Sequence, residues 1–127
     1  MTVVLDSGGI SALAANRARI NSMRRSGQWP PLVSTAVLTE SLTGDHRRDY
    51  DANHLLRLCI LRPVTEVIAR HAAALRYASR REGISAVDAI VAATADHAGG
   101  GVVWTSDLDD LTALVSHTVS RVVVAKV

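Results

Sequence analysis

The stretch Met1-Thr-Val-Val-Leu-Asp6-Ser-Gly-Gly-Ile10 decides how the rest of the chain is interpreted. Its apolar run, Val3 to Leu5, contains no polar residue, which is typical of a strand buried on both faces of a parallel sheet. The run ends at Asp6, and ligands of such sheets bind just beyond the carboxyl ends of the strands. Asp6 therefore occupies a place typical of a functional acid, although aspartate is equally favoured as a helix N-cap.

Length and composition predict one ordinary globular domain, residues 1–127. The chain is 48% hydrophobic and 20% charged, and it has neither a membrane-length apolar window nor the features of a signal peptide. We therefore expect no membrane association and a cytoplasmic location. The single cysteine, Cys59, excludes an internal disulfide and a Cys-based zinc site, and we expect it to be a buried bystander.

Short apolar runs alternate with helical patterns along the chain. Strands are expected at residues 3–5, 32–34, 59–61, 102–105 and 121–125. Helical patterns are expected at residues 10–25 (broken), 35–43, 49–58, 65–81, 86–98 and 108–115. This alternation predicts an α/β fold, a single Rossmann-like domain with a central, mainly parallel five-stranded sheet flanked by helices.

Three further acids lie where they could share a crevice with Asp6. Glu40 follows Val37 at i+3, so we expect it to point with the apolar face of its helix toward the core. Asp88 lies in Ser85-Ala-Val-Asp88, a spacing that also fits a capping box. Asp107 follows the strand at 102–105 and could equally cap the next helix. Each structural role is plausible alone, but in a doubly wound sheet all four positions can face the carboxyl edge.

A cluster of Asp6, Glu40, Asp88 and Asp107 requires a cation. Neighbouring carboxylates repel one another and raise each other's pKa unless positive charge is present. Mg²⁺ or Mn²⁺, which prefer oxygen ligands, resolve that conflict. The chemistry that such clusters serve is phosphodiester hydrolysis, in which the ion activates water and stabilises the leaving oxygen.

The motifs around these acids resemble those of PIN-domain nucleases. They read Val4-Leu-Asp6, Ser34-Thr-Ala-Val-Leu-Thr-Glu40, Ser85-Ala-Val-Asp88-Ala-Ile-Val-Ala-Ala-Thr-Ala95 and Thr105-Ser-Asp107-Leu-Asp-Asp110-Leu. Their order and spacing cover essentially the whole chain, and the small size resembles the VapC-type toxins of bacterial toxin–antitoxin modules.

The resemblance implies a Mg²⁺- or Mn²⁺-dependent endoribonuclease. In it the catalytic, metal-binding acids would be Asp6, Glu40, Asp88 and Asp107, and the supporting residues would be Ser7, Thr105 and Asp110. The resemblance also implies a homodimer that is inhibited by a cognate VapB-type antitoxin.

One position departs from the family's pattern. The first motif usually continues with Thr or Ser and then Ser, whereas Asp6 is followed here by Ser7 and Gly8. Ser7 keeps one hydroxyl, and Gly8 removes the second. This leaves open an alternative, a catalytically weak PIN-fold scaffold that binds RNA or protein.

Two further features bear on function. A phosphate-binding rim could be formed by Arg17, Arg19, Arg24, Arg25, Arg47, Arg48, Arg80 and Arg81, although ordinary solvated faces would look the same. A receiver-type phosphoryl acceptor would need an acid after the third strand and a lysine near the fifth. Residues 59–64 contain no acid, and we expect Lys126 to lie at the wrong end of the last strand.

Overall fold

The computed structural model describes residues 1–127 as an α/β fold with five strands and seven helices. The strands are β1 (Val3–Leu5), β2 (Leu32–Ser34), β3 (Ile60–Arg62), β4 (Gly101–Thr105) and β5 (Val122–Lys126). The helices are α1 (Ser7–Leu13), α2 (Arg17–Arg25), α3 (Thr35–Ser41), α4 (Tyr50–Leu56), α5 (Glu66–Ser79), α6 (Ala86–His97) and α7 (Leu108–Val115). This order confirms the predicted alternation.

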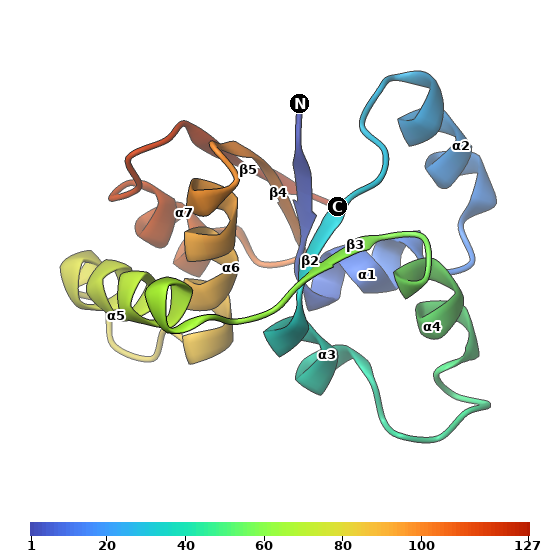
Figure 1. Ribbon diagram of the computed structural model, residues 1–127, viewed down its shortest axis with the longest axis horizontal. Coiled ribbons are helices and arrows are strands. Elements are labelled where there is room, and N and C mark those ends of the chain that lie inside the picture. The colour runs from blue at the N-terminus through green and yellow to red at the C-terminus, as the bar shows by residue number, and fades with distance from the viewer.

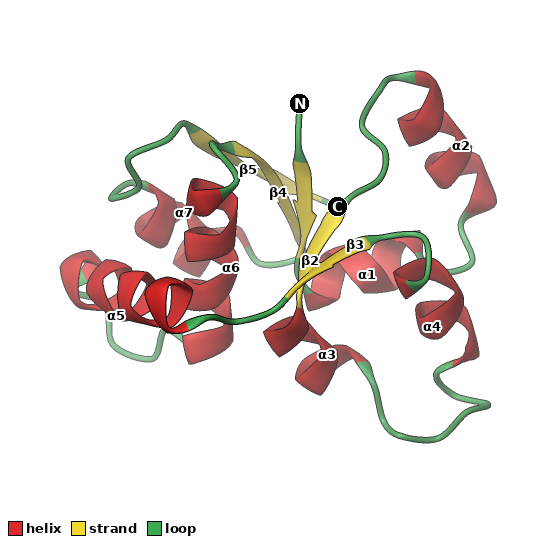
Figure 2. Cartoon of the chain, in the orientation of Figure 1, coloured by secondary structure: helices red, strands yellow, loops and turns green.

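All five strands are parallel and form one sheet in the order β3-β2-β1-β4-β5. The apolar β1 is the central strand, and each of its three residues is at most 1% exposed. In Figure 1, α1, α2 and α4 lie on one side of the sheet and α5, α6 and α7 on the other. Figure 2 shows the strands between these two helical layers. The fold class predicted from the sequence is thereby confirmed.

Small side chains bring α6 close to the sheet. Five of its residues are at most 1% exposed, namely Ala89, Val91, Ala92, Ala93 and Ala95. Alanine has no side-chain rotamers to order, so a helix face built from it packs against a sheet at short range. This close packing fixes the first turn of α6, which carries Asp88, relative to the end of β1.

Helix ends differ from the predicted ones where tertiary contacts intervene. The broken pattern at 10–25 becomes two helices, separated by Ala15 in a left-handed conformation. Helix α3 ends at Ser41, before Gly44, because the buried Asp49 carboxylate accepts hydrogen bonds from the backbone N–H groups of Thr43 and Gly44. These bonds hold the chain in a loop instead of a further helical turn.

Gly8 and Gly9, which follow Asp6 and Ser7, lie inside the first turn of α1. A Cβ on Gly9 would lie 2.7 Å from the carbonyl oxygen of Trp104. The helix can therefore approach β4 only because this residue has no side chain.

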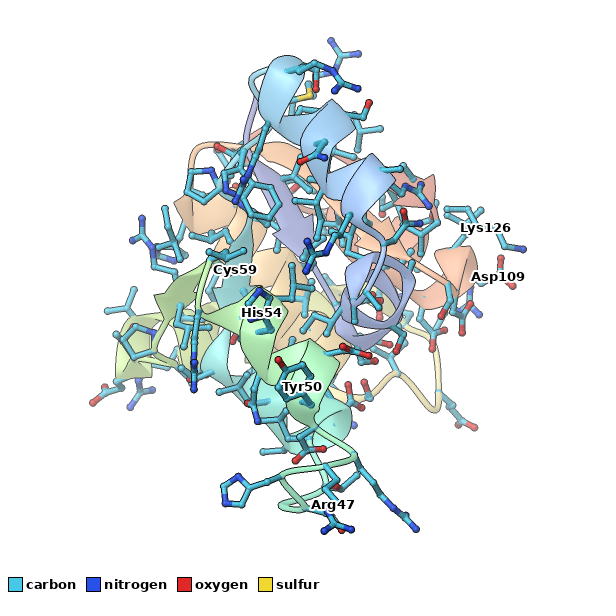
Figure 3. The ribbon with its side chains drawn as sticks, turned by 90° about the vertical axis from the view of Figure 1, so that its right-hand side faces the viewer. Arg47, Tyr50, His54, Cys59, Asp109 and Lys126 are labelled. Atoms are coloured by element: carbon cyan, nitrogen blue, oxygen red, sulfur yellow. The ribbon has the colours of Figure 1, made fainter.

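The structure also tests the expectations for Cys59 and Lys126. Cys59 is only partly buried, and burial raises the pKa of its thiol to about 12, so the thiol stays protonated and unreactive. Lys126 pairs in register with Thr105 at the carboxyl end of β5, contrary to the expected placement at the wrong end. In Figure 3 it lies at the same margin of the molecule as Asp109. No helix combines the length and apolarity needed to cross a bilayer.

Candidate active site

Asp6 lies directly after the central strand, at the carboxyl edge of the sheet. Figure 1 shows α3 and the start of α6 at this same end, the end at which β1 finishes. Asp6 is 7% exposed, and its Oδ1 accepts a hydrogen bond of 2.8 Å from the backbone N–H of Gly9. Asp6 therefore caps the N-terminus of α1, which is the structural role that the sequence also allowed for it. Because the cap uses Oδ1 alone, the position of the carboxylate is fixed while Oδ2 is left for other interactions.

Asp88 occupies the first turn of α6, and its backbone N–H donates a 3.0 Å hydrogen bond to Ser85 Oγ. Burial raises the pKa of its carboxyl to about 6, and the negative charges of Asp6, Glu40 and Asp110 add to the rise. Asp6 follows β1, Glu40 lies in α3 and Asp110 lies in α7, three segments that are far apart in sequence. Their common effect on Asp88 shows that the fold brings them together.

The expected orientation of Glu40 is wrong, because its side chain is exposed instead of pointing into the core. Helix α3 has only seven residues, and Val37 is its one fully buried side chain. The last turn of α3 therefore extends past the core into solvent. Glu40 still acts on the pKa of Asp88 and lines the groove described below, so it faces the acid cluster from its rim.

Asp107 and Thr105 form the turn between β4 and α7. The buried Thr105 hydroxyl donates to the Asp107 carbonyl oxygen and accepts from the Asp107 N–H, both at 3.0 Å. The Asp107 side chain is exposed and caps α7 by accepting from the N–H of Asp109. Thr105 thus fixes the direction in which the turn leaves the sheet. The third acid that raises the pKa of Asp88, after Asp6 and Glu40, is Asp110, one turn further on, and not Asp107.

Asp110 also has a basic partner. Arg81 Nη2 lies 3.2 Å from Asp110 Oδ1, and Arg81 Nη1 donates to the Asp109 carbonyl oxygen. Two other arginines of the predicted phosphate rim lie over tryptophan rings, Arg19 over Trp104 and Arg24 over Trp29. These three arginines have partners within the protein, and the phosphate-binding rim stays a prediction.

An open groove of about 550 Å³ lies beside the acids. Its lining is Ser7, Gly8, Ser11, Ala12, Glu40, Ser41, Ser106 and Val127. Ser7 was expected in the site, whereas Ser11, Ser41 and Ser106 were not. Ser11 could have been found, since it follows Ser7 at i+4 on one helix face. Nothing in the sequence signals Ser41 or Ser106, because each comes from another element.

The amino edge of the sheet, opposite to the acids, has no such cluster of acidic side chains in its pocket. A second pocket, of about 360 Å³, is lined there by Thr2, Leu32 and Ile60 among others, and it contains no acid. Both the acids and the hydroxyl-lined groove therefore lie at the carboxyl edge, where ligands of parallel α/β sheets bind.

The donor chemistry of the acid cluster suits a hard divalent cation. Its side chains offer only oxygen ligands, and the raised pKa of Asp88 reflects first its burial and then the negative charges around it. No group of three or more histidine, cysteine or acidic side chains is already drawn together closely enough to hold an ion. The residues fit a metal by ligand type and charge.

The sequence matches the PIN domain family over residues 3–114. The chain therefore belongs to the PIN domain family, whose nucleases typically use divalent metals. A search of curated proteins finds no significant match.

Solved structures of VapBC toxin–antitoxin complexes and of a VapC toxin share the fold. A DNA-bound VapBC from Salmonella typhimurium superposes with a TM-score of 0.73 at 16% identity, over 99% of this chain and 98% of that one. VapBC2 from Rickettsia felis, bound to a promoter DNA fragment, gives 0.71 at 14% identity over 100% and 99%. VapC20 from Mycobacterium tuberculosis, a toxin that cleaves the sarcin-ricin loop, gives 0.63 at 24% identity over 88% and 95%.

Proposed function

We propose that residues 1–127 form one PIN domain that acts as a metal-dependent endoribonuclease, the toxin of a type II toxin–antitoxin pair. The observation that carries the proposal is the grouping of Asp6, Glu40 and Asp110 around the partly buried Asp88, whose pKa is raised to about 6 by burial first and by these three negative charges second. Acidic residues that have shifted pKa values and lie beside a groove are typical of functional sites. Membership of the PIN family narrows the chemistry to nucleic-acid hydrolysis.

The acids would hold Mg²⁺ or Mn²⁺ through Asp6, Glu40, Asp88 and Asp107, with Asp110 as a further acid beside them. When bound, such an ion activates water and stabilises the leaving oxygen of a phosphodiester. Neighbouring residues of the chain hold these acids in position. The Gly9 N–H holds the Asp6 carboxylate, Ser85 Oγ accepts from the backbone N–H of Asp88, and Thr105 holds the turn that presents Asp107. The Asp6 carboxylate, which is already held in place, would lose little entropy on binding an ion.

The partners follow from the structural relatives. RNA is proposed as the substrate because VapC20, which shares the fold, cleaves the sarcin-ricin loop. A VapB-type antitoxin is proposed as the inhibitor because two of the similar structures are VapBC complexes. A homodimer in the cytoplasm, where RNA is accessible, completes the proposal.

Cleavage of a total RNA pool tests the enzymatic activity. We expect cleavage in Mg²⁺ or Mn²⁺, none in chelator, and none with Asp6→Asn. Asp51→Asn, which removes an exposed acid on α4, is the matched control and should cleave as the wild type does. Binding of Mn²⁺, followed by its EPR signal, is measured in the same samples. Bound Mn²⁺ without cleavage of any RNA would favour the scaffold alternative.

The toxin assignment needs a separate test. We expect the product of a small reading frame adjacent to the gene to co-purify with this chain and to block cleavage. If no adjacent product binds, the nuclease proposal stands and the toxin–antitoxin assignment fails.

A further inference from the structure

Arg81 connects the loop after α5 to the first turn of α7. Its Nη2 lies 3.2 Å from Asp110 Oδ1, and its Nη1 donates a hydrogen bond of 3.3 Å to the Asp109 carbonyl oxygen. The Arg81 side chain is 47% exposed and that of Asp110 25%, so water screens this ion pair only in part. The two contacts use separate nitrogens of one planar guanidinium group, which orients that group against α7. Arg81 is therefore held in place as a counter-charge to Asp110.

The backbone of the same loop directs Arg81 toward α7. Arg80 ends α5 in a left-handed conformation, with φ 53° and ψ 26°. This conformation is unfavourable for a residue with a side chain and persists only where the surroundings enforce it. Beyond Arg81, the carbonyl oxygen of the buried Ile84 accepts a 2.9 Å hydrogen bond from Arg76 Nε. Because the chain is anchored on both sides of Arg81, its position opposite Asp110 is a fixed feature of the fold.

Asp110 also faces the acids of the proposed active site. Its negative charge acts on Asp88, as do those of Asp6 and Glu40. The Asp110 carboxylate therefore has two possible positive partners, the Arg81 guanidinium group and a divalent cation held by the acids. It cannot pair fully with both, because a guanidinium group and a divalent cation repel each other at short range.

We propose that Arg81 restrains metal binding by competing with the ion for Asp110. The inference rests on the proposed nuclease function and concerns the regulation of that same site. In the metal-free protein, Arg81 reduces the repulsion between Asp110 and the other acids. The ion and Arg81 draw on the same carboxylate, so each weakens the binding of the other. Arg81 thereby raises the metal concentration at which the site fills, and it links metal occupancy to the loop between α5 and α6.

Equilibrium binding of Mn²⁺ in the absence of RNA, followed by the EPR signal of the free ion, tests the competition. Arg81→Met should tighten Mn²⁺ binding about 10-fold, a typical size for the coupling between two ligands. Asp110→Asn should weaken binding more in the Arg81→Met background than in the wild type, and it should remove most of the gain. Arg81→Lys keeps a positive charge beside Asp110 and should stay close to the wild-type affinity.

Arg80→Gly is the matched control. It removes the neighbouring positive charge, which makes no ion pair, and glycine favours the same left-handed backbone. It should leave Mn²⁺ affinity unchanged. Thermal unfolding in chelator checks the fold of each variant and gives a metal-free measurement. The midpoint should fall in Arg81→Met, because Asp110 loses its counter-charge, and adding Asp110→Asn should restore part of it.

Three results would each overturn the proposal. They are unchanged or weaker Mn²⁺ binding by Arg81→Met, an equal gain in Arg80→Gly, and a gain that survives the addition of Asp110→Asn. Tighter binding by Arg81→Met without cleavage of any RNA would support the restraint and refute the nuclease. Cleavage by the wild type without tighter binding by Arg81→Met would support the nuclease and refute the restraint.

Discussion

Helix α6 carries two aspartates whose environments are opposite. Asp88 lies in its first turn, where burial, and then Asp6 and Glu40, raise the pKa of its carboxyl to about 6. Asp96 lies in its last turn and is 7% exposed. Burial alone would raise the pKa of Asp96, but hydrogen bonds from the N–H groups of Ser120 and Val119 outweigh it, so that pKa lies below its usual value.

The contacts of Asp96 are those of a structural residue. Its two oxygens accept from Ser120 N at 2.7 Å and from Val119 N at 3.1 Å, and His71 Nε2 lies 3.1 Å away. These bonds tie the loop before β5 to α6. Asp49 does the same for the loop after α3. In both places the protein supplies enough donors to stabilise the charge.

Asp88, by contrast, has more negative than positive neighbours. Active sites often keep residues that lower the stability of the folded protein, because activity depends on them. The difference between the two ends of one helix therefore separates the acid of the proposed active site from the acid that holds the fold. The predictions below test that separation.

The largest expected effect is on cleavage. Asp88→Asn should lower the rate of RNA cleavage about 10²-fold or more, because a ligand carboxylate contributes several kcal/mol through the ion it holds. Asp96→Asn should retain the wild-type rate per folded molecule. The measurement is initial cleavage rate in Mn²⁺, normalised to the folded fraction seen by circular dichroism. A comparable loss in both variants would abolish the distinction between the two ends of α6.

Metal binding should stabilise the wild type through the same acids. At an Mn²⁺ concentration of about 100 times its dissociation constant, the free energy of unfolding should rise by about 2.7 kcal/mol. Asp88→Asn should lose most of this gain, and Asp96→Asn should keep it. Urea unfolding with and without Mn²⁺ measures the difference. An equal gain in all three proteins would place the metal elsewhere.

Asp96→Asn should lower the free energy of unfolding by about 2 kcal/mol at pH 7, since charge-assisted bonds to buried N–H groups are weakened. A carboxyl whose pKa is lowered by folding stabilises the protein above its unfolded pKa of 3.8 and loses that effect as the pH falls through the folded value. The deficit of the variant should therefore shrink in acid. Urea unfolding between pH 3 and 7 tests this, with Asp51→Asn as control.

The smallest effect has the opposite sign. Folding raises the pKa of Asp88 from 3.8 to about 6, so the metal-free protein loses stability as the pH rises through that window. Asp88→Asn should therefore be more stable than the wild type at pH 7, by about 1 kcal/mol after allowance for the partial exposure of the carboxyl. The gain should vanish below about pH 4. Thermal unfolding in chelator tests it, and a less stable variant at pH 7 would contradict the inference that burial and neighbouring charges destabilise the ionised Asp88.

The sequence by itself determined the order of elements and the positions of most acids. Buried strands and amphipathic helices follow from hydrophobic patterns within about ten residues, and the structure confirms that alternation. The same local patterns placed Asp6 after the first strand and Asp88 after the capping residue Ser85. These are short-range properties, because hydrogen bonding and side-chain periodicity act between neighbours in sequence.

Only the tertiary structure decided which side chains meet. It moved Glu40 from the expected core position to an exposed rim, and it brought Asp110 rather than Asp107 close enough to raise the pKa of Asp88. It also set Gly8 against Ser106, which are 98 positions apart, so closely that a Cβ on Gly8 would overlap both the side chain and the backbone nitrogen of Ser106. These outcomes depend on packing between distant elements to within an ångström, and no periodicity in the chain encodes such distances.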